Sequence, residues 1–272
     1  MASTLLHPTP SSRTVATEQF RAVGLALRTE AIFFISALIV LGAVVIASAI
    51  RFAHTPQAAG SHMGFTYGAG GAIPIFLMAL LIPFGVWRAE DPSRRAYHWS
   101  MPIARGPHTV MKLLSGWAWL MIATAVYLLF IIILATMIPS ITGEPIRLSE
   151  TPGWEWIIAF TATTLGYLLT SIAVVGSDHA WRWIAGLFFG YGVLIGIFNA
   201  LGIHDATRVL DTISNGTYGL NAALFGKTGY TQGHIAGEAM QRLSMSNWVV
   251  AMPLWIIGSG IAVTIASYRH RE

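Results

Sequence analysis

Six runs of apolar residues dominate the chain, and each is close to the length that a helix needs to cross a bilayer core. They contain almost no Asp, Glu, Lys or Arg, whereas the segments between them carry most of the charge. This pattern predicts an all-α integral membrane protein with six spans. The predicted spans are residues 31–50, 70–87, 113–138, 154–175, 183–203 and 248–268.

Two segments precede the first span. Residues 1–12 are rich in Ser, Thr and Pro, so we expect them to be poorly ordered. Apolar residues in 13–30 recur at helical spacing, which predicts an amphipathic helix lying in the inner membrane interface. A helix on the face of a soluble domain is the alternative. The residues of this stripe are Ala16, Phe20, Val23 and Leu27.

The densest charge cluster is the segment between the second and third spans, residues 88–112. Short basic loops lie on the cytoplasmic side of a membrane. The resulting topology places both termini in the cytoplasm, with 269–272 as a short tail, and puts eleven of the 16 Lys and Arg residues inside. The cations of the cluster are Arg88, Arg94, Arg95, Arg105 and Lys112, against the anions Glu90 and Asp91.

Composition excludes several classes of protein. Hydrophobic residues make up 54% of the 272 positions and charged residues only 10%, unlike a water-soluble domain. The net charge of +4 does not indicate nucleic-acid binding, because the cations lie in short loops without interleaved stacking aromatics. The chain has no cysteine, so disulfides and cysteine nucleophiles are excluded.

Two glycine-containing motifs suggest phosphate binding and a serine nucleophile, but both have simpler explanations. Gly226-Lys227-Thr228 lacks the glycine that a phosphate-binding loop carries five residues earlier, so ATP hydrolysis is not expected in this chain. Gly258-Ser259-Gly260 would need a base beside the serine to act as a nucleophile, and the predicted spans hold no histidine. Close packing of helices through small residues is the better explanation.

Four further glycines in the fifth predicted span form two small-xxx-small pairs. They predict close packing either against a partner subunit or against neighbouring helices of the same chain. The four are Gly186, Gly190, Gly192 and Gly196.

All nine histidines fall outside the apolar runs, which disfavours a membrane haem protein. Four outer histidines allow a metal site, but nothing in their spacing favours one over ordinary loop histidines, so we predict no metal or cofactor on this chain. Asn215-Gly216-Thr217 is a glycosylation sequon by pattern only. The four histidines are His54, His62, His204 and His234.

The predicted spans also lack interior ionisable groups, which disfavours a proton-coupled transporter. Aromatic and small polar side chains in the spans suit an amphipathic or lipid-like cargo. The segment 204–246 is predicted as a long outer loop, with an apolar patch near 220–225 that dips back toward the membrane.

The number of spans, the inside termini, the interfacial helix and the basic loop together resemble the membrane subunit of a type-two ABC exporter. Glu90 occupies the acidic position that follows the second span in that family. Met101-Pro102-Ile103-Ala104-Arg105 is similar to its proline-to-arginine stretch, and Met111-Lys112-Leu113 to its entry into the third span.

The basic loop can also form a short helix. Asp91 and Pro92 are a suitable helix start, with Asp at the cap and Pro in the first turn. A helix held between two spans and packed into a groove on a separate ATPase would transmit groove closure to both spans. The alternative is a solvated loop whose arginines only set topology.

The resemblance implies which residues would act. A coupling helix at about 91–101, aided by the short loop before the fifth span, would contact the ATPase. The fifth span would face a translocation path across a dimer, through Phe188, Phe189, Tyr191 and Asn199. The contact residues would be Glu90, Asp91, Arg94, Arg95, Tyr97, His98, Trp99, Pro102, Arg105, Asp178 and Arg182.

The resemblance further implies the partners and the compartment. They are two ATPase subunits that bind ATP and Mg, a second permease copy or a related permease, and the lipid of a bacterial inner membrane. The cargo is undecided between a peptide, a drug-like amphiphile, a lipid and a glycan. A signal that is never transported is a further alternative. A scaffold or assembly factor without transport, and a membrane enzyme acting on lipid, are the alternative functions.

Replacing Tyr97, His98 and Trp99 together with Ala should abolish co-purification of the ATPase, because these side chains are of the kinds that anchor interfaces. Affinity purification of the tagged protein measures this. Unchanged ATPase recovery would argue for a solvated loop.

Overall fold

A computed structural model describes most of the chain. The described residues are 12–54, 73–88, 105–142, 155–177, 179–228, 230–231, 234–235 and 241–269.

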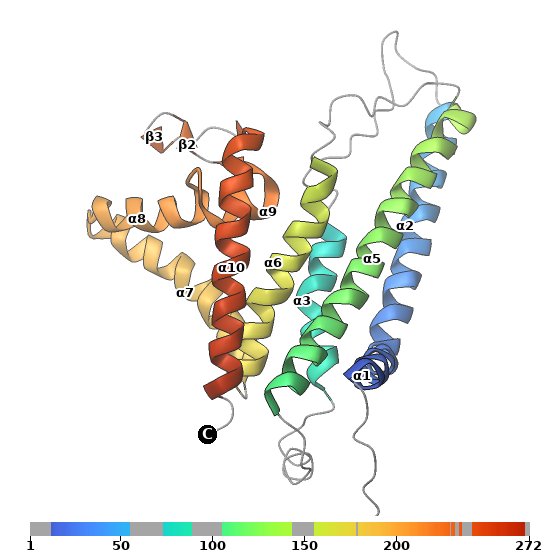
Figure 1. The fold of residues 1–272 in the computed structure, drawn as a ribbon. Helices are drawn as coiled ribbons and strands as arrows, with labels where there is room; N and C mark the ends of the chain where they lie inside the picture. The colour runs from blue at the N-terminus through green and yellow to red at the C-terminus, as the bar shows by residue number, and fades with distance from the viewer. Residues whose placement is uncertain are drawn as a thin grey trace, which may run out of the picture.

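Helices account for nearly all of the described structure, as Figure 1 shows. Their residue ranges are α1 Ser12–Ala26, α2 Arg28–His54, α3 Ile73–Trp87, α5 Arg105–Thr142, α6 Glu155–Gly176, α7 Ala180–Ala200, α8 His204–Asn215, α9 Leu220–Phe225 and α10 Met245–Arg269.

Short strands connect α9 to α10. They are β1 Lys227–Thr228, β2 Tyr230–Thr231, β3 His234–Ile235 and β4 Gln241–Arg242. Strand β1 pairs antiparallel with β4, and β2 with β3. Gly226 ends α9 with a φ of 60°, a conformation that favours glycine. The Gly226-Lys227-Thr228 motif is therefore a helix end followed by a strand.

Within the described residues, five helices are long and apolar enough to cross a membrane: α2, α5, α6, α7 and α10. The chain is therefore an all-α membrane protein, as its hydrophobic pattern predicts. Helix α3 has 15 residues, or about 22 Å at 1.5 Å per residue, against a hydrocarbon core of about 30 Å. The predicted start of the second span, at residue 70, lies outside the described residues, so the second span, and with it the total of six, stays a prediction.

Helices α2, α3, α5, α6 and α10 form a bundle, with α3 packed against both α5 and α6. The start of α1 and the end of α10 lie at the same end of this bundle (Figure 1). Two clusters of buried side chains hold it together. The first is shared by α1, α2, α3, α5 and α6, and the second joins α6, α9 and α10.

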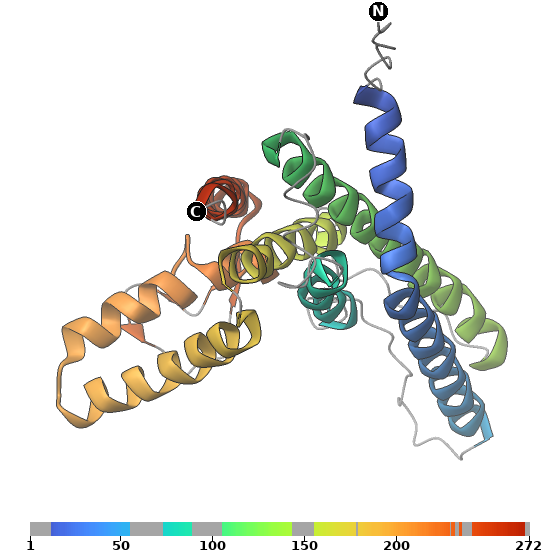
Figure 2. The same cartoon turned by 90° about the horizontal axis from the view of Figure 1, so that it is seen from below.

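Helix α1 differs from the predicted interfacial helix in its extent and in what its apolar side contacts. It ends at Ala26, and residues 28–30 already belong to α2. Figures 1 and 2 show α1 lying across the end of the bundle, at a steep angle to α2. Phe20 stacks on Trp119 of α5, with ring centroids 4.8 Å apart, while Val23 and Leu27 are buried. Three of the four stripe residues thus contact protein, while Ala16 is exposed, and the position of α1 in a membrane interface stays a prediction.

A close approach joins α3, α5 and α6. The hydroxyl of Tyr167 on α6 donates to the carbonyl oxygen of Leu113 on α5, at 2.9 Å. Gly116 makes room for this tyrosine, because a Cβ there would collide with the Tyr167 hydroxyl and with Cγ2 of Val86. Absence of a side chain at one position of α5 therefore sets the spacing of three helices.

Helix α7 is the least covered span. Together with α8 it projects sideways from the bundle in both views (Figures 1 and 2). A Cβ added at any of its four interior glycines would meet nothing within 4 Å in the described structure. Packing against helices of the same chain is thus excluded for these glycines among the described residues, and packing against a partner subunit remains.

Gly116→Ala should destabilise the fold by about 1–3 kcal/mol, because the added methyl group forces Tyr167 and Val86 apart. The midpoint of thermal unfolding in detergent measures this.

Gly190→Ala is the matched control, because its methyl group meets open space and alanine favours the helix by up to about 1 kcal/mol. Similar losses at the two positions would contradict the close approach.

Candidate functional site

Most of the predicted ATPase contacts fall in segments without a described conformation. Glu90, Asp91, Arg94, Arg95, Tyr97, His98, Trp99, Pro102 and Asp178 lie outside the described residues, and the predicted coupling helix lies there with them.

Arg105 begins α5, and its side chain is not described. Arg182 lies in the first turn of α7, where its N–H donates to the carbonyl oxygen of His179 at 2.9 Å. The sequence placed Arg182 in a loop before a span starting at 183. Helix α7 instead starts at Ala180, so Arg182 belongs to the helix and its side chain is exposed.

An ion pair joins the start of α2 to the end of α3. Nη2 of Arg88 lies 2.5 Å from Oε1 of Glu30, and the Glu30 side chain is only 12% exposed. Gly85 permits this contact, because a Cβ there would meet Glu30 Oε1 at 3.0 Å and Leu27 Cδ2 at 2.7 Å. The pair thus fastens the first residue after α3 to the elbow between α1 and α2.

A second cation is engaged where α5 faces the end of α3. The Nζ of Lys112 lies 4.5 Å from the centroid of the Trp87 ring, and Lys112 is 7% exposed. A partly desolvated cation over an indole ring is stabilised by about 1–2 kcal/mol. We call Glu30, Trp87, Arg88 and Lys112 the inner junction, after the predicted cytoplasmic side.

The inner junction changes the interpretation of the basic cluster. Two of its five cations, Arg88 and Lys112, contact the protein's own helices, so the basic surface open to a partner is smaller than the sequence indicates. Oε2 of Glu30 and Nε1 of Trp87 are buried without a hydrogen-bond partner in the described part of the chain. Trp87 and Arg88 directly precede the segment 89–104 in the chain, and Arg88 is the residue that pairs with Glu30.

Glu30 was not among the predicted site residues. Its signal in the sequence is a carboxylate at the very start of a long apolar run, two residues after Arg28. Such a charge needs a partner once the run enters the membrane. The pattern does not say which of the five cations supplies it.

The predicted translocation residues lie on the outside of this single chain. Phe188 and Phe189 are 78% and 70% exposed and contact each other edge to face, with centroids 5.9 Å apart. Tyr191 is bound to Ser214 of α8 through its hydroxyl at 2.6 Å, and Asn199 is exposed. These residues do not line an internal path within one chain, and a path across a dimer stays a prediction.

The predicted outer loop is largely folded. The amide of Asn215 donates to Oδ1 of Asp211 at 2.6 Å and accepts from the amide of Asn221 at 2.5 Å, so it joins α8 to α9. The sequon asparagine is thus a structural junction. Helix α9 packs on α6 and α10 with Ala222, Ala223 and Leu224 buried.

Two of the four candidate metal-binding histidines belong to described helices. His54 lies in the last turn of α2, with Nδ1 2.8 Å from the carbonyl oxygen of Ile50, and His204 begins α8. His62 and the side chain of His234 lie outside the described structure. Over the residues that the structure describes, no three His, Asp or Glu side chains gather as metal ligands.

Comparison with protein-family models, with curated proteins and with solved structures yields no match to this chain. The resemblance to ABC exporter membrane subunits therefore stays an expectation from the span pattern and the basic loop.

Arg88→Ala should lower the free energy of unfolding by about 1–3 kcal/mol, because the buried Glu30 carboxylate loses its charged donor. The double variant E30A/R88A should lose less than the two single variants together, because no unpaired charge remains. Unfolding in detergent, followed by tryptophan fluorescence, measures these losses.

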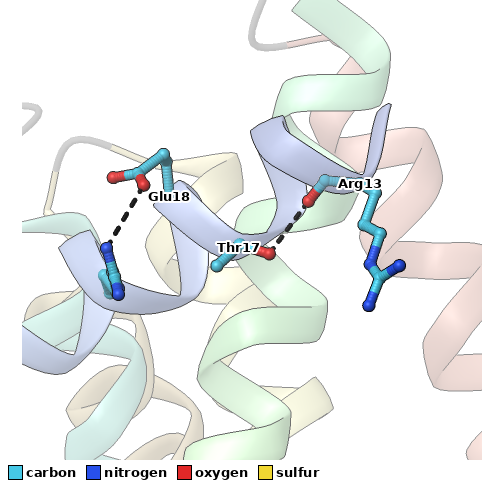
Figure 3. A network of polar contacts seen from close by, with 4 residues as sticks. Arg13, Thr17 and Glu18 are labelled. Carbon is cyan, nitrogen blue, oxygen red and sulfur yellow. Dashed lines mark hydrogen bonds and ion pairs between the residues drawn. The ribbon is translucent and has the colours of Figure 1, made fainter. Parts of the chain in front are cut away.

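Arg21→Ala is the matched control on the same elbow. Arg21 pairs with Glu18 at 3.5 Å, and both side chains are about two-thirds exposed. Figure 3 shows the Glu18 contact beside the hydrogen bond from Thr17 to the Arg13 carbonyl. An exposed pair of this kind contributes less than about 1 kcal/mol, so equal losses for the Arg21 and Arg88 variants would refute the role of the inner junction.

Proposed function

We propose that the chain is the membrane-spanning permease subunit of an ATP-driven exporter of the ABC type. A separate subunit would bind and hydrolyse ATP with Mg, since this chain carries no phosphate-binding loop. In this proposal the inner junction faces the cytoplasm of a bacterial cell, and both termini lie on that side.

The observation that supports this proposal best is how the helices that flank the segment 89–104, α3 before it and α5 after it, are fastened near this segment. On one side Arg88 is bound to Glu30 at the α1–α2 elbow. On the other, Lys112 of α5 packs over Trp87 at the end of α3. A displacement of the segment would therefore pull on α2, α3 and α5 together.

This arrangement is what a coupling element requires. A partner that pushes on a freely hinged loop moves only the loop, whereas a partner that pushes on a loop with packed ends moves the helices attached to it. Trp181 of α7 also contacts Phe84 of α3, with centroids 5.6 Å apart. The movement would thus reach α7, where the predicted path residues lie.

A second permease copy would cover α7. Its long side chains are exposed along most of its length, and its interior glycines meet open space. Small residues on an apolar helix allow another helix to approach closely in a membrane. Two copies meeting there would place Phe188, Phe189 and Asn199 of both chains around a shared path for an amphipathic cargo.

Affinity purification of the tagged protein from gently solubilised membranes tests the proposal. We expect a soluble subunit with a phosphate-binding loop to co-purify in stoichiometric amount, with ATPase activity in the eluate. Mass spectrometry identifies the subunit.

F188A/F189A is the matched control for the Tyr97, His98 and Trp99 variant. It changes exposed aromatics away from the basic loop, so it should retain the ATPase. If the intact protein purifies without an ATPase, the exporter proposal fails and a scaffold becomes the better explanation.

A further inference from the structure

A cleft of about 770 Å³ lies between α10, α6 and the turn from α8 to α9. This volume falls within the range of about 300–1,000 Å³ that small-molecule sites occupy. Two of its walls, α6 and α10, are helices long and apolar enough to cross a membrane. The cleft does not include the predicted path residues on α7.

The walls of the cleft are mostly apolar. Leu169 of α6, Ile213 of α8 and Leu254 of α10 contribute aliphatic side chains, and Trp255 contributes its indole ring. Nε1 of Trp255 already donates to the carbonyl oxygen of Tyr218 at 2.9 Å. None of the described residues that line the cleft is ionisable apart from Tyr218, so the cleft suits an uncharged and largely apolar ligand.

Thr212, Thr217 and Tyr218 add polar groups near the turn from α8 to α9, and Ser259 adds one from the spanning helix α10. Ser259 is 5% exposed and lines the cleft from the middle of α10, yet its hydroxyl has no hydrogen-bond partner within the described structure. Thr124 and Thr163, by contrast, donate one turn back, to Leu120 at 2.9 Å and to Ala159 at 2.7 Å. Ser171 of α6 also has a buried hydroxyl without a described partner, but it does not line the cleft. A buried donor left free in this way can bind an acceptor on a ligand.

Gly258, the residue before Ser259, also borders the cleft. A Cβ at this position would meet nothing within 4 Å. The sequence suggested that Gly258 and Gly260 serve close packing of helices. In the described structure neither glycine is approached by another helix.

We propose that the cleft binds one acyl chain of a membrane phospholipid. The chain lies against Leu169, Ile213 and Leu254, and its ester carbonyl accepts a hydrogen bond from the Ser259 hydroxyl. An esterified chain fits better than a free fatty acid, because the cleft holds no cation to pair with a carboxylate. The inference goes beyond the proposed function and does not depend on an ATPase partner.

Photolabelling of the full-length protein tests this site. The protein is reconstituted into phosphatidylethanolamine and phosphatidylglycerol vesicles with a trace of phosphatidylcholine that carries a diazirine in its acyl chain. After irradiation, mass spectrometry maps the labelled residues. We expect labelling of α10 between residues 254 and 262, and of α8 near Ile213.

Two variants and one control make the test specific. Gly258→Leu fills the cleft and should reduce labelling there about tenfold, equivalent to about 1.4 kcal/mol. Ser259→Ala keeps the shape and removes the donor, so labelling should fall about three- to tenfold. Gly260→Leu adds the same side chain to the same helix away from the cleft and should leave labelling unchanged.

Three results would overturn the proposal. One is equal labelling in the wild type and in Gly258→Leu, which would mean that only surface lipid is detected. Another is stronger labelling by free palmitic acid carrying the same diazirine than by the phospholipid. The third is absence of lipid labelling at α10 together with disulfide formation between two chains that carry Leu254→Cys, which would identify a second copy of the chain as the occupant.

Discussion

Hydrocarbon offers no hydrogen-bond partner to a peptide group, and the structure depends on this constraint. Each long apolar run must satisfy its own backbone, which only a helix can do within a single segment. Several threonines inside the spans follow the same requirement. Thr124, Thr163 and Thr164 each donate to a carbonyl one turn earlier in their own helix, so they add no unpaired groups to the membrane interior.

Since lipid is as apolar as the side chains, burying leucine does not by itself bring these helices together. Small residues and a few hydrogen bonds between helices set their spacing instead. Gly116 lets Tyr167 reach the backbone of α5, and Gly24 lets Trp119 bind the carbonyl of Phe20 at 3.0 Å. Charges of the described spans are confined to their ends, where Glu30 with Arg88, and Lys112 with Trp87, hold the inner junction together.

The bundle and the projecting pair of helices, α7 and α8, would serve different purposes in the proposed exporter. The inner junction ties the end of α3 to α2 and α5, which suits the transmission of force. Helix α7 is barely covered by its own chain, which suits a partner subunit. Between the two parts lies the cleft beside Ser259, the proposed site for a membrane lipid. Transmission of force, contact with a partner subunit and lipid binding would thus use separate surfaces of the same chain.

The sequence alone determined the class of the protein and the position of its five long apolar helices. Long uncharged runs leave the backbone no choice but a helix, so each of the five long spans covers most of a predicted run. The apolar stripe of α1 was also visible, because helical spacing is a local property. The apolar patch at 220–225 was visible in the sequence as well. Helix α9 buries it against α6 and α10, and the predicted dip of this patch toward the membrane stays a prediction.

Only the tertiary structure decided which groups meet. Pairing of Glu30 with Arg88 depends on the packing of α2 against α3, and no local pattern distinguishes Arg88 from the other four cations of its cluster. Residues distant in the sequence likewise decide whether the space beside a glycine is occupied. Tyr167 occupies the space beside Gly116, whereas a Cβ at Gly190 or Gly258 would meet nothing within 4 Å. Periodicity reports the environment along one helix, but a site is made by side chains from several helices, and their relative placement is a property of the whole fold.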